Sequence, residues 1–383
     1  MSIANKILIV AGEASGDHHA ARLVAAIKEE RPAAEFFGVG GEALAAQGVR
    51  LLCPASELAV VGLLEVIGRL PAVFKALRDI GRALRTETPQ LVILVDFPDF
   101  NFWVARLARW HRVPVMYYIS PQVWAWRTYR VRTIARLVDR MVVIFPFEAE
   151  FYRDRGVPAE YVGHPLVETL PSLPSREALL QNWGLDPRRF TLALLPGSRG
   201  SEIERHLPTM LQGAALIKQA IPETQFILPL ASTAPGELVS ESVAKSGDLG
   251  VKIIPGQSYA ALAAAHLAVV ASGTATVEAA LAATPSIIVY RLSPFTFAVG
   301  RLLIRVEHVG MANLLATERL FPELLQHLFT PESLAREVLS LVKDQERLEV
   351  LHRGLARIKE RLGGPGASRR AARVALEIMA GSQ

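Results

Sequence analysis

Short apolar runs rich in β-branched residues alternate with segments of helical periodicity along the whole chain. Such runs are typical of buried strands, and strands separated by helices form parallel sheets that are covered by helices on both faces. The predicted strands are Lys6–Gly12, Glu35–Val39, Leu91–Val95, Pro114–Ile119, Met141–Phe145, Leu192–Leu195, Gln225–Leu230, Val251–Ile254, Leu267–Ala271 and Ser286–Tyr290. The pattern therefore predicts an α/β protein.

Proline and serine interrupt this alternation in residues 163–176 (GHPLVETLPSLPSR), which predicts a domain boundary. A chain of 383 residues also exceeds the roughly 250–300 residues at which one hydrophobic core stops growing. We therefore expect two Rossmann-like doubly wound domains, residues 1–165 and 166–345, facing each other across a cleft. Residues 346–383 predict two helices, joined at Gly363–Gly366, that pack back toward an N-terminal domain, their own or a partner's.

The composition limits the classes of protein to which the chain can belong. Hydrophobic residues make up 51% of the chain and charged residues 21%, as in a well-packed globular protein. No apolar run reaches the roughly 18 residues that a transmembrane helix needs, and the apolar stretch near the N-terminus is too short for a signal peptide. The single cysteine, Cys53, excludes an intramolecular disulfide. These features predict a cytoplasmic protein.

The formal net charge is +5, and arginines are concentrated in one segment. Its members are Arg127, Arg130, Arg132, Arg136 and Arg140. Such a run is usually a solvated helix face, and attraction to anionic lipid or to a phosphorylated substrate is the functional alternative. No nucleic-acid-binding motif accompanies the charge, so we expect no nucleic acid partner.

The most informative motif is VVASGTATVE, residues 269–278. It predicts a buried strand, a Ser-Gly-Thr turn and a helix, so that backbone N–H groups and the positive end of the helix dipole converge on one point. Gly273 allows a ligand to approach the backbone, and Glu278, about one helical turn further on, is placed to accept hydrogen bonds from ribose hydroxyls. The motif predicts a seat for a nucleotide diphosphate.

A second strand-to-helix turn occurs in LALLPGSRGSE, residues 192–202. Here Arg199 adds a planar cation that matches phosphate oxygens. An ordinary capped connection is the alternative for either turn alone, but two such turns in one half of the chain favour a nucleotide-diphosphate ligand. Neither turn matches the dinucleotide fingerprint or the Walker pattern, which argues against a dehydrogenase or a P-loop enzyme.

Polar residues also follow the predicted strands of the first half, at the carboxyl edge where ligands of open α/β sheets bind. These residues are Glu13, Ser15, Gly16, Asp96, Asp99, Ser120, Gln122 and Trp124. The first half thus offers carboxylates and aromatic side chains, while the second offers phosphate seats. This division suits a group-transfer enzyme that binds one substrate in each domain. The expected acceptor-side residues are Ser15, Gly16, Ser120, Gln122 and Trp124.

Transfer of a sugar to a hydroxyl requires a general base, and Asp96 is the first candidate. The neighbouring Phe97 and Pro98 exclude water and raise the pKa of a carboxyl group. Capping of the following helix is the alternative role for Asp96, and Asp99 and Glu13 remain open as bases. No Asp-x-Asp motif is present, so we expect no metal dependence and no cofactor.

Residues 58–77 (LAVVGLLEVIGRLPAVFKAL) are almost entirely apolar. On general grounds this segment predicts a core helix broken at Gly68 or Pro71. However, its apolar residues point in nearly every direction, and arginines follow it, as in a surface helix that dips into anionic lipid.

Several longer motifs resemble those of the bacterial lipid-A-disaccharide synthases over nearly the full length of the chain. The matching segments are AGEASGD (11–17), ELAVVGLLEVIGRLP (57–71), VDFPDFN (95–101), SPQVWAWR (120–127), FPFE (145–148), VGHPL (162–166), LPGSRGSEI (195–203), ASGTATVEAAL (271–281), YRLSPFTF (290–297) and NLLA (313–316). Other nucleotide-sugar enzymes of the same fold share the turns but not SPQVWAWR or YRLSPFTF. The chain departs from the family pattern at His18–His19, at Phe97 and at residues 308–311.

The resemblance implies a GT-B fold and a peripheral position on the cytoplasmic face of the inner membrane. The implied reaction transfers 2,3-diacylglucosamine from UDP to 2,3-diacylglucosamine 1-phosphate (lipid X), with inversion and without a metal. Asp96 would be catalytic. The implied UDP-side contacts are Gly197, Ser198, Arg199, Glu202, Ser272, Gly273, Thr274, Ala275, Glu278, Asn313 and Gln326. The resemblance also implies that residues 58–77 bind the membrane, in place of the core helix expected on general grounds. The implied membrane contacts are Val61, Leu63, Leu64, Val66, Ile67, Leu70 and Phe74.

Other functions remain open at this stage. A UDP-N-acetylglucosamine 2-epimerase would use the same turns but has no need for the apolar segment 58–77. A glycosyltransferase with another lipid-linked acceptor is chemically closer, and a non-catalytic nucleotide-sugar sensor would not need Asp96. A homodimer is also left open.

Overall fold

The computed structural model describes residues 5–58, 65–126, 128–231, 234–292, 310–316 and 320–381. The chain forms two compact units. The first consists of Met1–Glu168 together with Leu362–Gln383, and the second of Thr169–Arg361.

The first unit is built on a parallel sheet that has seven strands among the described residues, in the order β3-β2-β1-β4-β5-β6-β7. The strands are β1 (Lys6–Ala11), β2 (Glu35–Gly40), β3 (Arg50–Pro54), β4 (Leu91–Val95), β5 (Val115–Tyr118), β6 (Arg140–Val143) and β7 (Ala159–Tyr161). The central strand β4, LVILV, is buried at every position. A continuous apolar run of this kind fits a strand that is covered on both faces.

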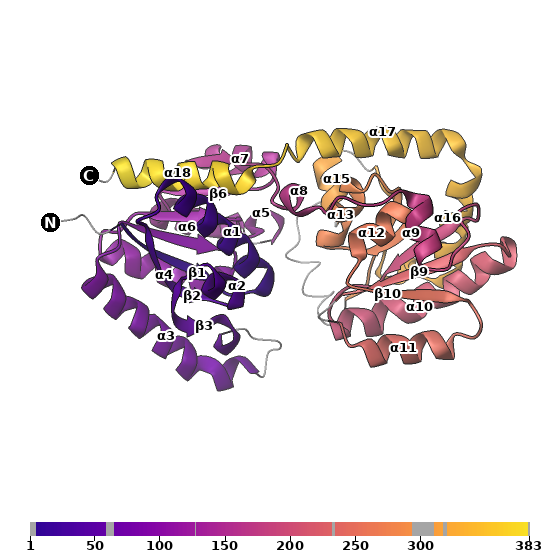
Figure 1. Cartoon of the computed structure of the whole chain (residues 1–383), viewed down its shortest axis with the longest axis horizontal. Coiled ribbons are helices and arrows are strands. Elements are labelled where there is room, and N and C mark those ends of the chain that lie inside the picture. Colours follow the sequence, from indigo (N-terminus) through magenta and orange to yellow (C-terminus); the bar gives the residue numbers. More distant parts are fainter. Residues whose placement is uncertain are drawn as a thin grey trace. The chain divides into compact units, whose positions relative to one another are not determined.

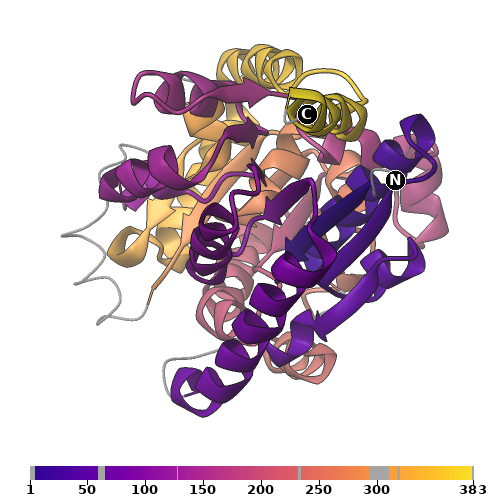
Figure 2. The ribbon, with the colours of Figure 1, turned by 90° about the vertical axis from the view of Figure 1, so that its left-hand side faces the viewer.

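Helices cover both faces of this sheet. The helices of this unit are α1 (Ala14–Glu30), α2 (Glu42–Ala46), α3 (Glu65–Glu87), α4 (Pro98–Trp110), α5 (Val123–Trp126), α6 (Val131–Leu137), α7 (Pro146–Arg153) and α18 (Ala367–Gly381). Helix α8 (Leu166–Thr169) lies at the boundary of the two units. Helix α18, the last of the chain, packs along α1, while α3 packs with α4 on the opposite side of the sheet (Figures 1 and 2).

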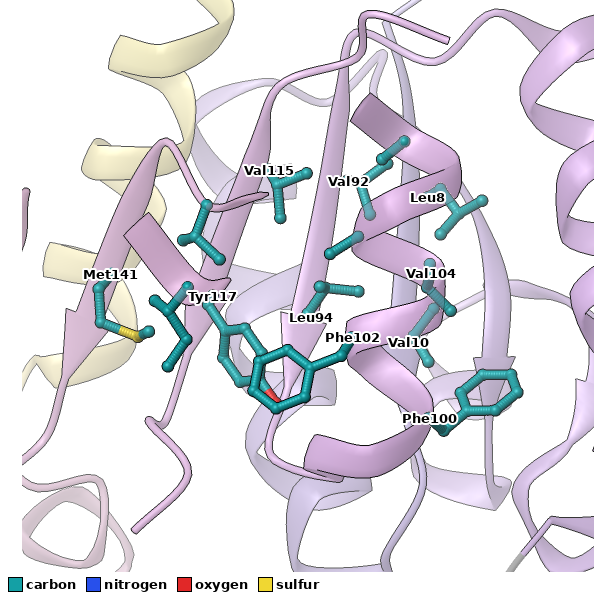
Figure 3. Close-up of a cluster of buried hydrophobic side chains, with 14 of the residues drawn as sticks. Leu8, Val10, Val92, Leu94, Phe100, Phe102, Val104, Val115, Tyr117 and Met141 are labelled. Carbon is teal, nitrogen blue, oxygen red and sulfur yellow. The ribbon is translucent and has the colours of Figure 1, made fainter. Parts of the chain in front are cut away.

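The core of the first unit lies between the sheet and α4. Leu8, Val10, Val92, Leu94 and Val115 project from the strands on this side, and Phe100, Phe102 and Val104 project from the helix (Figure 3). The buried Tyr117 ring lies among them, with its centroid 6.4 Å from that of Phe102. This packing fixes α4 on the sheet, and with it the turn that joins β4 to α4.

The second unit has a parallel sheet with six strands among the described residues, in the order β10-β9-β8-β11-β12-β13. The strands are β8 (Thr191–Leu195), β9 (Gln225–Leu230), β10 (Val251–Pro255), β11 (Leu267–Ala271), β12 (Ser286–Tyr290) and β13 (Glu323–Leu325). The helices are α9 (Arg176–Asn182), α10 (Gly200–Ala220), α11 (Gly236–Lys245), α12 (Ser258–Ala264), α13 (Thr274–Leu281), α15 (Met311–Ala316), α16 (Pro331–Lys343) and α17 (Gln345–Arg361).

The predicted fold class, two Rossmann-like doubly wound α/β units, is confirmed, and all ten predicted strands are present. Three strands were not predicted: β3, β7 and β13, each at the edge of its sheet. The described chain ends in two helices, of which α18 belongs to the first unit and α17 to the second, whereas we expected both to pack back toward an N-terminal domain.

The predicted helix break at Gly68 or Pro71 is wrong, because α3 runs from Glu65 to Glu87 with Pro71 inside it. A proline removes one backbone hydrogen bond, and the buried Ala76, Ile80 and Leu84 hold this helix on the sheet. Among the expected membrane contacts, Val61, Leu63 and Leu64 lie outside the described residues, and Val66 and Ile67 lie in α3. None of the described helices is long and apolar enough to cross a membrane.

Candidate functional site

Asp96 and Glu13 meet at the carboxyl edge of the first sheet. Strands β1 and β4 are neighbours, with Ala11 opposite Val95, so the residues that follow them lie side by side. Burial raises the pKa of the half-buried Asp96 carboxyl to about 6, and the negative charge of Glu13 adds to this shift. A carboxylate with this pKa is ionised near neutral pH and is still basic enough to accept a proton.

Asp99 differs from Asp96 in its surroundings. It lies in the first turn of α4, its side chain is 74% exposed, and Oδ1 lies 2.7 Å from Nη1 of Arg130. Asp99 is thus open to water and engaged by a cation, whereas Asp96 is half-buried. The structure therefore favours Asp96 over Asp99 as the proton acceptor.

The turn that carries Asp96 has an unusual backbone. Asp96 has a φ of 46° and Phe97 a φ of 49°, so two successive residues other than glycine adopt the left-handed conformation. Each such residue costs about 1 kcal/mol or more. The Phe97 ring packs on Gly12, where an added Cβ would lie 2.1 Å from a ring carbon. Gly12 is thus required for the close approach of the two turns.

Of the expected acceptor-side residues, Ser120 and Trp124 turn inward. The Ser120 hydroxyl and the Trp124 indole N–H each donate to Oε1 of Glu148 at 3.0 Å, and the Phe145 N–H donates to its Oε2 at 3.2 Å. Gln122 and Ser15 are exposed, and Gly16 is buried. Among the five expected acceptor-side residues, Gln122 and Ser15 are therefore the two that are exposed to solvent.

Glu148 was not identified from the sequence. It is 1% exposed, and burial raises its pKa to about 7, against the opposing effect of its hydrogen bonds. By joining the segment after β5 to the start of α7, it fixes two neighbouring loops of the ligand edge. The spacing of Glu148 from Phe145 could have indicated part of this role, because a Glu three residues after the N-cap of a helix is typical of a capping box.

In the second unit, the turn after β11 has the expected form. Gly273 has a φ of 153°, which only glycine adopts readily, and a Cβ at this position would meet no atom of the described residues within 4 Å. Helix α13 begins at Thr274, so the N–H groups at its start have no acceptor from a preceding turn of helix. Glu278 is half-buried, burial raises the pKa of its carboxyl, and this carboxyl has no hydrogen-bond or ion-pair partner among the described residues.

The turn after β8 is organised around Glu202. Its Oε2 accepts the N–H groups of Ser198 at 3.2 Å and of Arg199 at 3.4 Å. Gly197, with a φ of 117°, passes so close to Glu202 that a Cβ would lie 2.4 Å from Oε2. The Glu202 carboxylate therefore binds these backbone amides, and its Oε1 also lies 3.5 Å from Nη1 of Arg199, whose side chain is 71% exposed.

A buried histidine joins this turn to the end of β12. Nδ1 of His206 lies 2.8 Å from the Pro196 carbonyl oxygen, and Nε2 accepts the Arg291 N–H at 3.0 Å. These partners require a proton on Nδ1 and none on Nε2, so the ring is neutral, and burial lowers its pKa. No local sequence pattern indicates this role, because the partners are 10 and 85 residues away.

The remaining expected UDP-side residues differ in exposure. Asn313 is completely buried, and its amide bonds to Phe321 and to the Glu323 carboxylate, which positions β13. Gln326 follows β13 in a left-handed conformation with a φ of 54° and is half-buried. Thr274 is exposed, and Ser272 and Ala275 are half-buried. Asn313 thus contacts the protein, while Gln326 reaches the solvent at the carboxyl edge.

The fold first defines the class of protein. Similar solved structures include the calicheamicin glycosyltransferase CalG4 (TM-score 0.61, 17% identity, covering 97% of this chain and 98% of that chain). Another is a UDP-N-acetylglucosamine 2-epimerase from Neisseria meningitidis bound to UDP-GlcNAc (TM-score 0.62, 13% identity, 97% and 100% covered). The protein therefore has the GT-B fold of glycosyltransferases and epimerases.

The sequence comparisons identify the family. The model of the lipid-A-disaccharide synthetase family matches residues 7–378. A lipid-A-disaccharide synthase from Myxococcus xanthus is 47% identical over 374 residues, covering 98% of this chain and 97% of that protein. One from Syntrophus aciditrophicus is 44% identical over 373 residues, covering 97% of each. The chain belongs to the lipid-A-disaccharide synthase family, and is thus a hexosyltransferase of lipid A biosynthesis.

Proposed function

We propose that the protein transfers 2,3-diacylglucosamine from UDP to 2,3-diacylglucosamine 1-phosphate, with inversion at the sugar carbon and without a metal ion. Membership of the family supports this reaction. The observation that carries the mechanism is the half-buried Asp96 carboxylate, whose pKa is raised to about 6 at the ligand edge of the first unit.

In this mechanism Asp96 removes the proton from the 6-hydroxyl of the acceptor sugar. The oxygen attacks the anomeric carbon of the donor from the face opposite to UDP, and the bond from that carbon to the diphosphate breaks. The product is the β-1,6-linked disaccharide 1-phosphate, and the proton remains on Asp96 until solvent removes it. A base of this kind contributes ~10²–10⁴-fold to the rate.

The second unit supplies the donor site. We assign the diphosphate to the open turn at Gly273 and the N-terminus of α13, together with the exposed Arg199 guanidinium. The unpaired Glu278 carboxylate would accept the ribose hydroxyls, about one turn into α13. Helix dipole, arginine and backbone amides together stabilise the charge that develops on the leaving UDP.

We also propose that the protein binds the cytoplasmic face of the inner membrane peripherally, where its lipid substrates reside. Leu70 and Phe74 on α3 are 42% and 67% exposed, and Trp103 on α4 is 56% exposed with the Arg106 guanidinium 4.9 Å from its ring centre. Apolar side chains beside arginines are typical of a surface that enters anionic lipid.

The test is an assay of the purified protein with UDP-2,3-diacylglucosamine and 2,3-diacylglucosamine 1-phosphate, separately and together, with and without EDTA. We expect release of UDP only when both substrates are present, at a rate that EDTA does not change. Sugar isomerisation without acceptor would instead indicate an epimerase. Product formation with another lipid-linked acceptor, but not with this one, would redirect the acceptor assignment.

A further inference from the structure

The strained turn between β4 and α4 is fixed at one atom. The Asp96 carbonyl oxygen accepts two hydrogen bonds of 2.6 Å, one from Nδ2 of Asn101 and one from the Tyr117 hydroxyl. Nδ2 of Asn101 also lies 3.3 Å from the Val95 carbonyl oxygen. Two short hydrogen bonds to a single carbonyl are more than an ordinary turn requires.

Both donors are held rigidly. Asn101 and Tyr117 are completely buried. Asn101 belongs to the first turns of α4, while Tyr117 projects from β5 on the side of the sheet that α4 covers (Figure 3). The two side chains therefore reach the same oxygen from a helix and from a strand, and neither can move without disturbing the core.

The fixed carbonyl determines where the Asp96 carboxylate lies. Because Asp96 and Phe97 are both left-handed, the turn has no preference of its own for this conformation and would relax to negative φ if it were released. Relaxation would rotate the Cα–Cβ bond of Asp96, which now places the carboxyl group in a half-buried position close to Glu13.

We propose that Asn101 and Tyr117 are positioning residues that hold the strained Asp96–Phe97 turn, so that the Asp96 carboxylate stays at the ligand edge. This inference rests on the proposed role of Asp96 as the base. It goes beyond that role, because neither residue contacts a substrate and both act through a backbone atom of Asp96.

The structure offers a matched pair of variants. Tyr117→Phe removes one of the two donors. Tyr118→Phe removes the hydroxyl of the next residue, which is equally buried but points to the opposite face of β5. Both variants lose one hydroxyl from the same strand, so a difference between them reports the contact with Asp96 rather than the loss of a buried group.

The first measurement is the pKa of the Asp96 carboxyl by carbon-13 NMR in full-length protein. We expect it to move from about 6 toward the ordinary aspartate value in Tyr117→Phe and further in Asn101→Ala, and to stay in place in Tyr118→Phe, because a released turn moves the carboxyl away from burial and from Glu13. An unchanged Asp96 pKa in both Tyr117→Phe and Asn101→Ala would overturn the proposal.

The second measurement is steady-state kinetics with both substrates. We expect kcat to fall by ~10-fold or more in Tyr117→Phe, with the KM for the UDP-sugar nearly unchanged. If Asp96→Asn is itself fully active, the proposed function fails, whereas the NMR result still decides the positioning role. The two failures are thus distinguishable.

Phe97→Gly provides a rescue, because glycine adopts the left-handed conformation without strain. In this background Asn101→Ala should displace the Asp96 pKa less than it does alone. If Asn101→Ala fails to fold by itself, the comparison of Tyr117→Phe in the two backgrounds gives the same test. An effect of equal size in both backgrounds would contradict the strain argument.

Discussion

Asp96 differs from Glu13, Asp17 and Asp99 because its carboxyl is neither exposed to solvent nor hydrogen-bonded to a fixed partner at both oxygens. Asp99 forms an ion pair with Arg130. The Asp17 carboxylate accepts hydrogen bonds from the N–H groups of Gly41 and Ala43 at the start of α2. Glu13 is exposed and acts on Asp96 through its charge. Environment, rather than residue type, separates the proposed base from its neighbours.

The first prediction concerns pH. Since burial and Glu13 raise the Asp96 pKa to about 6, and since a base must be ionised to act, kcat/KM should fall as the pH is lowered through about 6. Glu13→Gln removes one cause of the raised pKa, so the acid limb should shift to lower pH. The measurement is a pH–rate profile of both proteins. If kcat/KM of Glu13→Gln falls at the same pH as that of wild type, the charge of Glu13 does not raise the pKa of Asp96.

The second prediction concerns Glu278. If its unpaired carboxylate binds the ribose, Glu278→Gln should weaken UDP binding by ~10-fold, because hydrogen bonds to a charged acceptor are the stronger ones. Calorimetry with UDP and with 2′,3′-dideoxy-UDP checks this assignment. The variant should bind UDP more weakly than wild type does, but should bind 2′,3′-dideoxy-UDP with unchanged affinity. An equal loss for both nucleotides would place the carboxylate elsewhere in the site.

At the scale of elements, the central strands were predictable because each is a continuous apolar run. The edge strands β3, β7 and β13 are short or partly exposed, and their residues lack this signal. The two turns of the second unit were predictable because each motif is local. Contacts such as Glu148 with Ser120, or His206 with Arg291, join residues far apart in sequence, so no local pattern reveals them.

The third prediction concerns α3. Leu70 and Phe74 are exposed, whereas Ile80 on the same helix is completely buried. Replacing both Leu70 and Phe74 with serine should move the protein from the membrane pellet to the supernatant without lowering the melting temperature. Ile80→Ser is the control and should lower the melting temperature, since it places a hydroxyl in the core. A large fall in the melting temperature of the double variant would mean that these side chains are core residues.

The fourth prediction concerns the link between β8 and β12. His206→Ala leaves the Pro196 carbonyl and the Arg291 N–H without their partner, which should destabilise the second unit by about 2–4 kcal/mol. His206→Gln, which can donate and accept at similar positions, should recover part of the loss. Urea unfolding followed by the fluorescence of Trp183, in the second unit, measures both variants. Equal stability of His206→Ala and wild type would show that the link contributes nothing.

At the scale of the whole molecule, the chain distributes its functional groups over two separately packed units. The proposed base and the acceptor-side loops belong to the first unit, and the proposed diphosphate and ribose contacts belong to the second. The sequence predicted this distribution, because the two kinds of motif lie in different halves of the chain. We expected both C-terminal helices to pack back toward an N-terminal domain, but α18 belongs to the first unit and α17 to the second, because an amphipathic pattern does not specify which sheet a helix covers.

Measuring UDP affinity and turnover of Asp96→Asn tests most directly whether the base belongs to the first unit and the nucleotide site to the second. A change in the first unit should leave the Kd for UDP within about two-fold of wild type, because the nucleotide is bound by the second. Turnover with both substrates should fall by ~10² or more, because the acceptor hydroxyl then has no base. An Asp96→Asn enzyme that turns over within a few-fold of wild type would show that Asp96 is not the base.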